Sequence, residues 1–86
     1  MVDRSYNAKK KHEVEYYLWL VAEVEMSQND TVTLGEFSSS TPILIDTLVR
    51  QDTGVELTSS IANNQITLTS AGTNLKVVIF AFGVKA

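Results

Sequence analysis

Residues 13–26, EVEYYLWLVAEVEM, decide the fold class of this chain. The odd positions carry four glutamates around a short stretch with Tyr17, Trp19 and Val21. The even positions are all apolar: Val14, Tyr16, Leu18, Leu20, Ala22, Val24 and Met26. A period of two is that of a β-strand, whereas a helix would scatter these residues around its circumference. The alternation predicts one strand of about 14 residues, long enough that a bend or bulge is expected within it.

Shorter apolar segments separated by turn residues continue this pattern along the chain. They centre on residues 31–34, 43–49, 55–61, 66–69 and 75–84. Val, Ile and Thr, which favour strands, supply 24 of the 86 residues. The sequence Ala62-Asn63-Asn64-Gln65 predicts a tight hairpin, because Asn tolerates the positive φ of such turns. We therefore expect an all-β domain, either a small antiparallel β-sandwich or a jelly-roll-like barrel of about six strands.

The last of these segments, residues 75–84, is apolar on both faces. Its alternating positions hold Leu75, Val77, Ile79 and Ala81 on one side and Val78, Phe80, Phe82 and Val84 on the other. A strand of this kind lies at the centre of a sheet with both faces covered, or a partner chain covers one face.

Charge is distributed unevenly along the chain. The formal net charge is −3, yet residues 1–12 carry +3 and residues 13–86 carry −6. Residues 1–12 also lack a hydrophobic period. They are therefore interpreted as a flexible basic N-terminal arm on a single β-sandwich domain of residues 13–86. The acidic body excludes a protein that binds nucleic acid over its whole surface.

Lys9, Lys10 and Lys11 are the candidate contact for a polyanion. Lysines on a flexible segment can displace counterions from phosphates. However, only Tyr6 lies near them to stack on a base, and the adjoining body is acidic. The alternative is a solvated segment that keeps a β-protein soluble. We therefore expect no nucleic-acid partner.

Catalytic or metal-binding chemistry would have to come from the pairs Glu13/Glu15 and Glu23/Glu25 or from His12, the single histidine. Paired carboxylates can act as acid and base, or bind a hard cation through oxygen. Both pairs lie on what the alternation makes an exposed strand face, where charges prevent wrong pairing of strands. A lone histidine on an arm lacks the orienting partner of a catalytic triad. The sequence predicts no catalytic, metal or cofactor site.

Composition also restricts the possible chemistry and cellular location of the protein. The chain has no cysteine, which excludes disulfides, thiolate nucleophiles and Cys-ligated metals. No apolar run approaches the ~20 residues that span a bilayer, and the first residues lack the apolar core of a signal peptide. We expect no membrane partner and a location inside the cell.

Tyr17, Trp19 and Val21 form an apolar centre on the otherwise acidic face of the first long strand. Trp and Tyr inside a charged rim have the composition of an interface core. The alternative is that a second sheet or the arm covers them. The last strand adds three candidates: Val78, Phe80 and Phe82. A small domain buries only part of such a surface, which predicts a closed homo-oligomer, a trimer being one form.

The stretch from Gly54-Val55-Glu56-Leu57 through Ile66–Thr73 (ITLTSAGT) leads into the apolar strand Val77–Gly83. It resembles the closing strands of small virion proteins of tailed phages and similar viruses, including decoration proteins and tail-associated β-sandwiches. The likeness is one of Ser/Thr/Asn-rich hairpins before an apolar terminal strand. It implies a non-enzymatic structural subunit, cytoplasmic or in the virion, that oligomerises and binds a larger protein lattice. No functional residue carries over from it.

Two functions fit these observations. The first is a structural or assembly protein that acts through self-association and protein–protein contacts. The second is a small binding module that uses Tyr17 and Trp19 to bind carbohydrate or to inhibit a host protein. An enzyme, the third alternative, would need carboxylates brought together from different strands.

Overall fold

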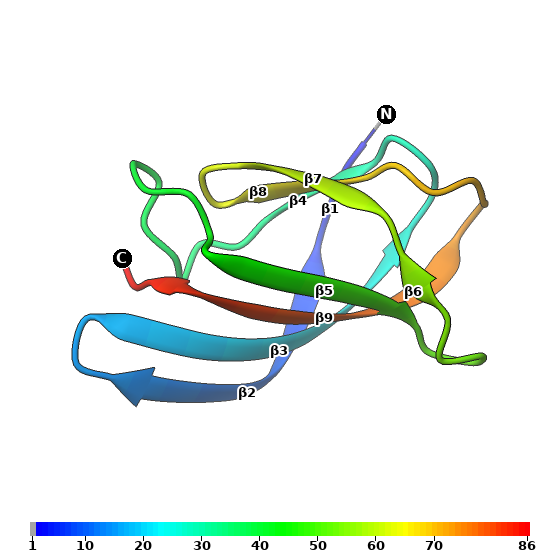
Figure 1. Cartoon of the computed structure of the whole chain (residues 1–86). Helices are drawn as coiled ribbons and strands as arrows, with labels where there is room; N and C mark the ends of the chain where they lie inside the picture. The colour runs from blue at the N-terminus through cyan, green and yellow to red at the C-terminus, as the bar shows by residue number, and fades with distance from the viewer. Residues whose placement is uncertain (1) are drawn as a thin grey trace.

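The computed structural model describes residues 2–86, which form two β-sheets and no helix (Figure 1). One sheet has four strands in the order β1-β4-β8-β7, and the other has five in the order β2-β3-β9-β5-β6. Neighbouring strands are antiparallel except for the parallel pair β1 and β4. The strands are β1 (Asp3–Arg4), β2 (Tyr6–Val14), β3 (Tyr17–Met26), β4 (Thr31–Thr33), β5 (Ile45–Arg50), β6 (Glu56–Leu57), β7 (Ser59–Ala62), β8 (Gln65–Leu68) and β9 (Leu75–Val84). The predicted all-β class is confirmed.

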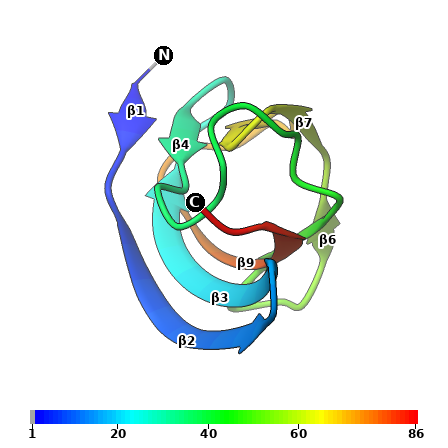
Figure 2. The same ribbon diagram turned by 90° about the vertical axis from the view of Figure 1, so that its left-hand side faces the viewer.

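Five connections carry the chain from one sheet to the other, and two of them are single residues. Ser5 alone separates β1 from β2, and Thr58 alone separates β6 from β7. All four of these strands lie at the edges of their sheets. Bends of this kind form the corners at which two packed sheets meet. The sheets are therefore joined along both sides, as the view along the strands shows (Figure 2). One core of buried side chains lies between them.

The single strand predicted for residues 13–26 is wrong, because two strands occupy this stretch. β2 ends at Val14, and β3 begins at Tyr17 after a turn at Glu15 and Tyr16. Val14 pairs directly with Tyr17, so the turn reverses which positions face the core. The even positions of β3 are buried as expected, but Val14 is 46% and Tyr16 75% exposed. The sequence does not predict this turn, because neither of its residues is the Gly, Asn or Pro that marks most turns.

The flexible arm predicted for residues 1–12 is not confirmed. Asp3–Arg4 form β1, and residues 6–12 belong to β2, which pairs with β3 and has a bulge at Lys9. Met1 lies outside the described residues. This segment lacked a hydrophobic period because β2 is an edge strand whose side chains are exposed on both faces, apart from Tyr6 at its start.

Two other predictions from the sequence are confirmed. β9 spans Leu75–Val84 and lies between β3 and β5, at the centre of its sheet, although its outer face is partly open, with Phe80 44% exposed. Asn63 and Asn64 form the turn between β7 and β8, and Asn63 adopts a φ of 52°. The core between the sheets consists of Leu18, Leu20, Ala22, Val24, Met26, Val32, Leu34, Phe37, Ile43, Leu48, Ile66, Leu68, Val77, Ile79 and Ala81.

A buried carboxylate, that of Asp30, ties the N-terminal segment to this core. Asp30 is 2% exposed. It accepts hydrogen bonds from the backbone N–H of Ser27 (2.9 Å), the backbone N–H of Val2 (3.0 Å) and Nε of Arg4 (2.8 Å). Arg4 also donates to Asn74 Oδ1 at 3.0 Å. Arg4, counted in the basic segment by its sequence, is thus engaged inside the fold.

We expect acid to weaken the fold as Asp30 becomes protonated. The Ser27 N–H, and after it the bonds from Arg4 and Val2, hold the pKa of Asp30 below its ordinary 3.8, although burial opposes them. Because the folded-state pKa is the lower one, the stabilisation is complete above the unfolded-state value of about 3.9. It is lost as the pH falls through the folded-state pKa. Urea unfolding between about pH 6 and pH 2 measures this loss.

The control for this experiment is Asp30→Asn, which cannot ionise at this position. The difference in stability between the wild type and Asp30→Asn should shrink as the pH falls through the acid range. A difference that stayed constant across that range would contradict the role given to the Asp30 carboxylate.

Candidate functional site

The six residues predicted as an interface lie together on one face of the five-stranded sheet. Three come from β3 and three from the neighbouring β9: Tyr17, Trp19, Val21, Val78, Phe80 and Phe82. In the register of these strands Trp19 lies opposite Phe82, and Val21 lies opposite Phe80. Their side chains point away from the core, because the alternate positions of both strands are buried. We call these six residues the aromatic face.

Large side chains of the aromatic face are open to solvent. Tyr17 is 41%, Trp19 46% and Phe80 44% exposed, and the other three residues are half-buried. The Phe82 ring stacks on Tyr17, with centroids 5.5 Å apart and planes inclined by 12°. It also contacts Trp19 at a centroid distance of 4.5 Å. The rings therefore pack against one another, and part of their flat surface is already used within the chain.

Four further apolar residues, not assigned to the interface from the sequence, extend the aromatic face. Ile45 lies opposite Phe82, and Val49 lies opposite Val78. The other two are Val14 and Val84, which both flank Tyr17. Two signals in the sequence could have found three of them: Val84 continues the outward positions of β9, and Ile45 and Val49 alternate with their neighbours along β5. Val14 has no such signal, because no typical turn residue marks the β2–β3 turn.

The three lysines proposed to contact a polyanion do not form one cluster. Lys10 lies opposite Val21 and so borders the aromatic face, whereas Lys11 lies opposite the buried Leu20, on the other side of the sheet. Lys9 occupies the bulge, and its Nζ is 3.5 Å from Glu23 Oε1. All three belong to the edge strand β2, where lysines and a bulge hinder pairing with another strand.

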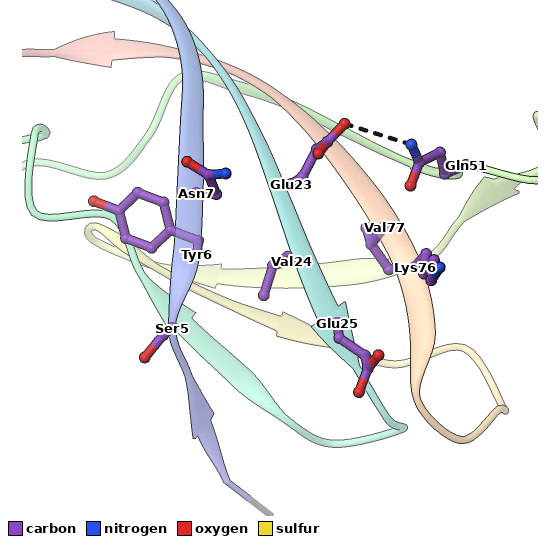
Figure 3. Close-up of a pocket in the computed structure, with 9 residues that line it drawn as sticks. All are labelled: Ser5, Tyr6, Asn7, Glu23, Val24, Glu25, Gln51, Lys76 and Val77. Carbon is purple, nitrogen blue, oxygen red and sulfur yellow. Dashed lines mark hydrogen bonds between the residues drawn. The ribbon is translucent and has the colours of Figure 1, made fainter.

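A polar hollow of about 600 Å³ adjoins the aromatic face near the C-terminal end of β3 (Figure 3). Its walls come from the start of β2, from β3 and β9, and from the end of β5. They are formed by Ser5, Tyr6, Asn7, Glu23, Val24, Glu25, Gln51, Lys76 and Val77. Gln51 Nε2 donates to Glu23 Oε2 at 3.4 Å, across β9. Sequence reasoning could not assemble this hollow, because its walls meet only through the strand order.

Three of the four carboxylates considered for catalysis have basic or amide partners. In the hollow, Glu23 faces Lys9 and Gln51, and Glu25 Oε1 lies 3.9 Å from Arg4. Far from them, Glu13 Oε2 lies 3.1 Å from Lys85 Nζ. The two pairs therefore do not meet in space. Glu13, Glu23 and Glu25 are thus engaged in ion pairs and a hydrogen bond at the surface.

Tyr6, at the edge of the hollow, has a hydroxyl that links two segments of the chain. Its hydroxyl donates to Glu36 Oε1 and accepts the backbone N–H of Gly35 at 3.2 Å. Burial, and then the hydrogen bond and charge of Glu36, raise the pKa of Tyr6 to about 12. The phenol therefore stays protonated at neutral pH and fastens β2 to the Gly35–Glu36 segment.

The remaining candidate is His12, which lies on β2 opposite Trp19, at the rim of the aromatic face. Within residues 2–86, no three His, Cys, Asp or Glu side chains are grouped so that they could hold a metal ion. The same part of the chain contains no helix long and apolar enough to cross a membrane. No family model matches the chain, and neither a curated protein nor a solved structure is significantly similar to it.

Proposed function

We propose that the protein is a non-enzymatic assembly protein, a small β-sandwich that acts through self-association and contacts with other proteins. One observation carries the proposal: six apolar residues, from strands about fifty residues apart in the sequence, form one contiguous, solvent-exposed surface. Exposed apolar patches rimmed by polar groups are typical of protein–protein interfaces. The rim here includes Lys10 and His12 on one side and Glu23 at one end.

The arrangement of the rings favours a protein partner over a sugar. Carbohydrate modules stack a sugar ring on a free, flat aromatic surface. Phe82 instead uses its ring in contacts with Tyr17 and Trp19. Side chains that stand on a sheet and pack against each other suit interdigitation with a second protein surface. The resemblance to small virion proteins supports a virion as the setting of this assembly.

Sedimentation equilibrium of the wild type and of two single variants, Phe80→Ser and Trp19→Ser, tests the proposal. We expect the wild type to associate, and each variant to dissociate at least about thirtyfold more readily, the effect of removing an aromatic anchor from an interface core. Both substitutions lie on the outer face of the sheet, so circular dichroism should show an unchanged fold.

Tyr16→Ser is the matched control, because Tyr16 is an exposed aromatic residue in the β2–β3 turn and is not part of the aromatic face. It should associate like the wild type. The same samples are titrated with a panel of oligosaccharides. If the wild type were monomeric and bound a sugar, and Trp19→Ser abolished that binding, carbohydrate binding would be the function and assembly would not.

A further inference from the structure

The aromatic face carries opposite charges on its two sides. The register places Lys10, Val21, Phe80 and Thr47 in one row across the sheet, all on the outer face. The next row contains Glu23, Val78, Val49 and Glu56. Lys10 therefore borders the face along the β2 edge, and Glu56 borders it along the β6 edge. Neither forms an ion pair within the part of the chain that the structure describes, residues 2–86.

Two-fold symmetry allows two ways of stacking this face on the same face of a second copy. With the axis perpendicular to the strands, each β2 would lie over the partner's β2, and Lys10 would meet the partner's Lys10. With the axis parallel to the strands, each β2 lies over the β5–β6 side of the partner, where Glu56 is. Consecutive outward-facing rows are only ~7 Å apart along a strand, a spacing that a lysine side chain can span. Charge complementarity selects the second arrangement.

The size of the face is sufficient for such a pair. β3 and β9 each have 10 residues, which makes the face ~33 Å long. Four strands, β2, β3, β9 and β5, span ~19 Å at ordinary strand spacing. Because β5 has only 6 residues and β2 has 9, each copy would cover ~550 Å² and the pair ~1,100 Å², just above the ~1,000 Å² that a biological interface needs. Association through the β2 edges instead would bring two lysine-rich strands together, and like charges oppose it.

We infer that the aromatic face binds a second copy of this chain, in a two-fold dimer whose axis runs parallel to the strands and pairs Lys10 of each copy with Glu56 of the other. This inference rests on the proposed function and specifies its partner. A two-fold contact of one patch with itself is closed, so the assembly stops at two chains.

Charge reversal tests the dimer. Dissociation constants are measured by sedimentation for Lys10→Glu, Glu56→Lys and the double variant. Each single variant replaces two attractive pairs by two repulsive ones and should weaken association roughly tenfold. The double variant restores both pairs with reversed sign, and its dissociation constant should lie within about threefold of the wild type. The mass at high concentration should be twice 9.5 kDa.

Lys11→Glu is the matched control. It changes the net charge as Lys10→Glu does, but Lys11 lies opposite the buried Leu20 on the other side of β2. It should associate like the wild type. Equal effects of Lys10→Glu and Lys11→Glu, absence of rescue in the double variant, or a mass other than two chains would overturn the inferred dimer. If Phe80→Ser still prevented association in those cases, the proposed function would stand and only the arrangement would fall.

Discussion

Replacing Ile79 with Ala should lower the free energy of unfolding by about 2–5 kcal/mol, the usual cost of such a cavity in a packed core. Ile79 is fully buried and lies between Ala22 of β3 and Leu48 of β5, at the middle of the central strand. A domain of this size has a total stability on the order of 5–15 kcal/mol or less. The substitution should therefore remove a large part of it.

The neighbouring residue in the sequence provides the control. Phe80 points to the opposite side of β9 and is 44% exposed, so Phe80→Ala should cost about 1 kcal/mol or less. Both variants are unfolded in urea and followed by circular dichroism, at a chain concentration too low for association to add stability. Equal losses for Ile79→Ala and Phe80→Ala would mean that both faces of β9 are covered within one chain, and the aromatic face would not be free to bind.

Removing the carboxylate of Asp30 should lower the melting temperature by roughly 10 °C or more, as expected for a domain of this size. Asp30→Ala leaves the N–H groups of Ser27 and Val2 and the guanidinium of Arg4 without the acceptor that they share. Buried donors without an acceptor lower the stability of the fold, because they have lost their hydrogen bonds to water and gain none within the protein. The loss should also release β1, whose parallel pairing with β4 begins beside this carboxylate.

A second acid of the same segment is the control. Asp3 is exposed and accepts hydrogen bonds from the hydroxyls of Thr31 and Thr33, at 2.9 and 3.3 Å. Because these hydroxyls can bond to water instead, Asp3→Ala should melt within about 3 °C of the wild type. Calorimetry measures both variants. If Asp30→Ala melted as the wild type does, Asp30 would not anchor the N-terminal segment.

Strands that have one buried face were readable from the sequence, and strands without one were not. β3 alternates clearly because one of its faces packs on the second sheet. β9 is apolar on both faces, a pattern typical of a strand at the centre of a sheet. The sequence of β2 predicts an arm because it has no hydrophobic period. As an edge strand, β2 is exposed on both faces after Tyr6. The turn at Glu15 and Tyr16 leaves no mark in the sequence, because Val14 and Tyr16, although exposed, are apolar residues at even positions and so extend the alternation of β3.

The candidate site divides in the same way. The six residues of the aromatic face were found because apolar side chains at solvent-facing positions stand out once a strand's period is known. Their assembly into one surface depends on β3 and β9 being neighbours, which no local pattern specifies. The polar hollow and the opposed charges of Lys10 and Glu56 depend on the order of four or five strands. Those features became visible only with the topology.

The central position of β9 has a consequence for how the chain acquires its structure during synthesis. Of the nine strands described here, β9 leaves the ribosome after the other eight, yet it supplies the hydrogen-bonding partner of both β3 and β5. Until Leu75–Val84 has emerged, β3 has one unpaired edge and β5 can pair only with the short β6. Nascent chains must therefore carry exposed strand edges, which favour aggregation and chaperone binding. Folding of the larger sheet is completed in one late step that joins distant parts of the sequence, a slow type of closure.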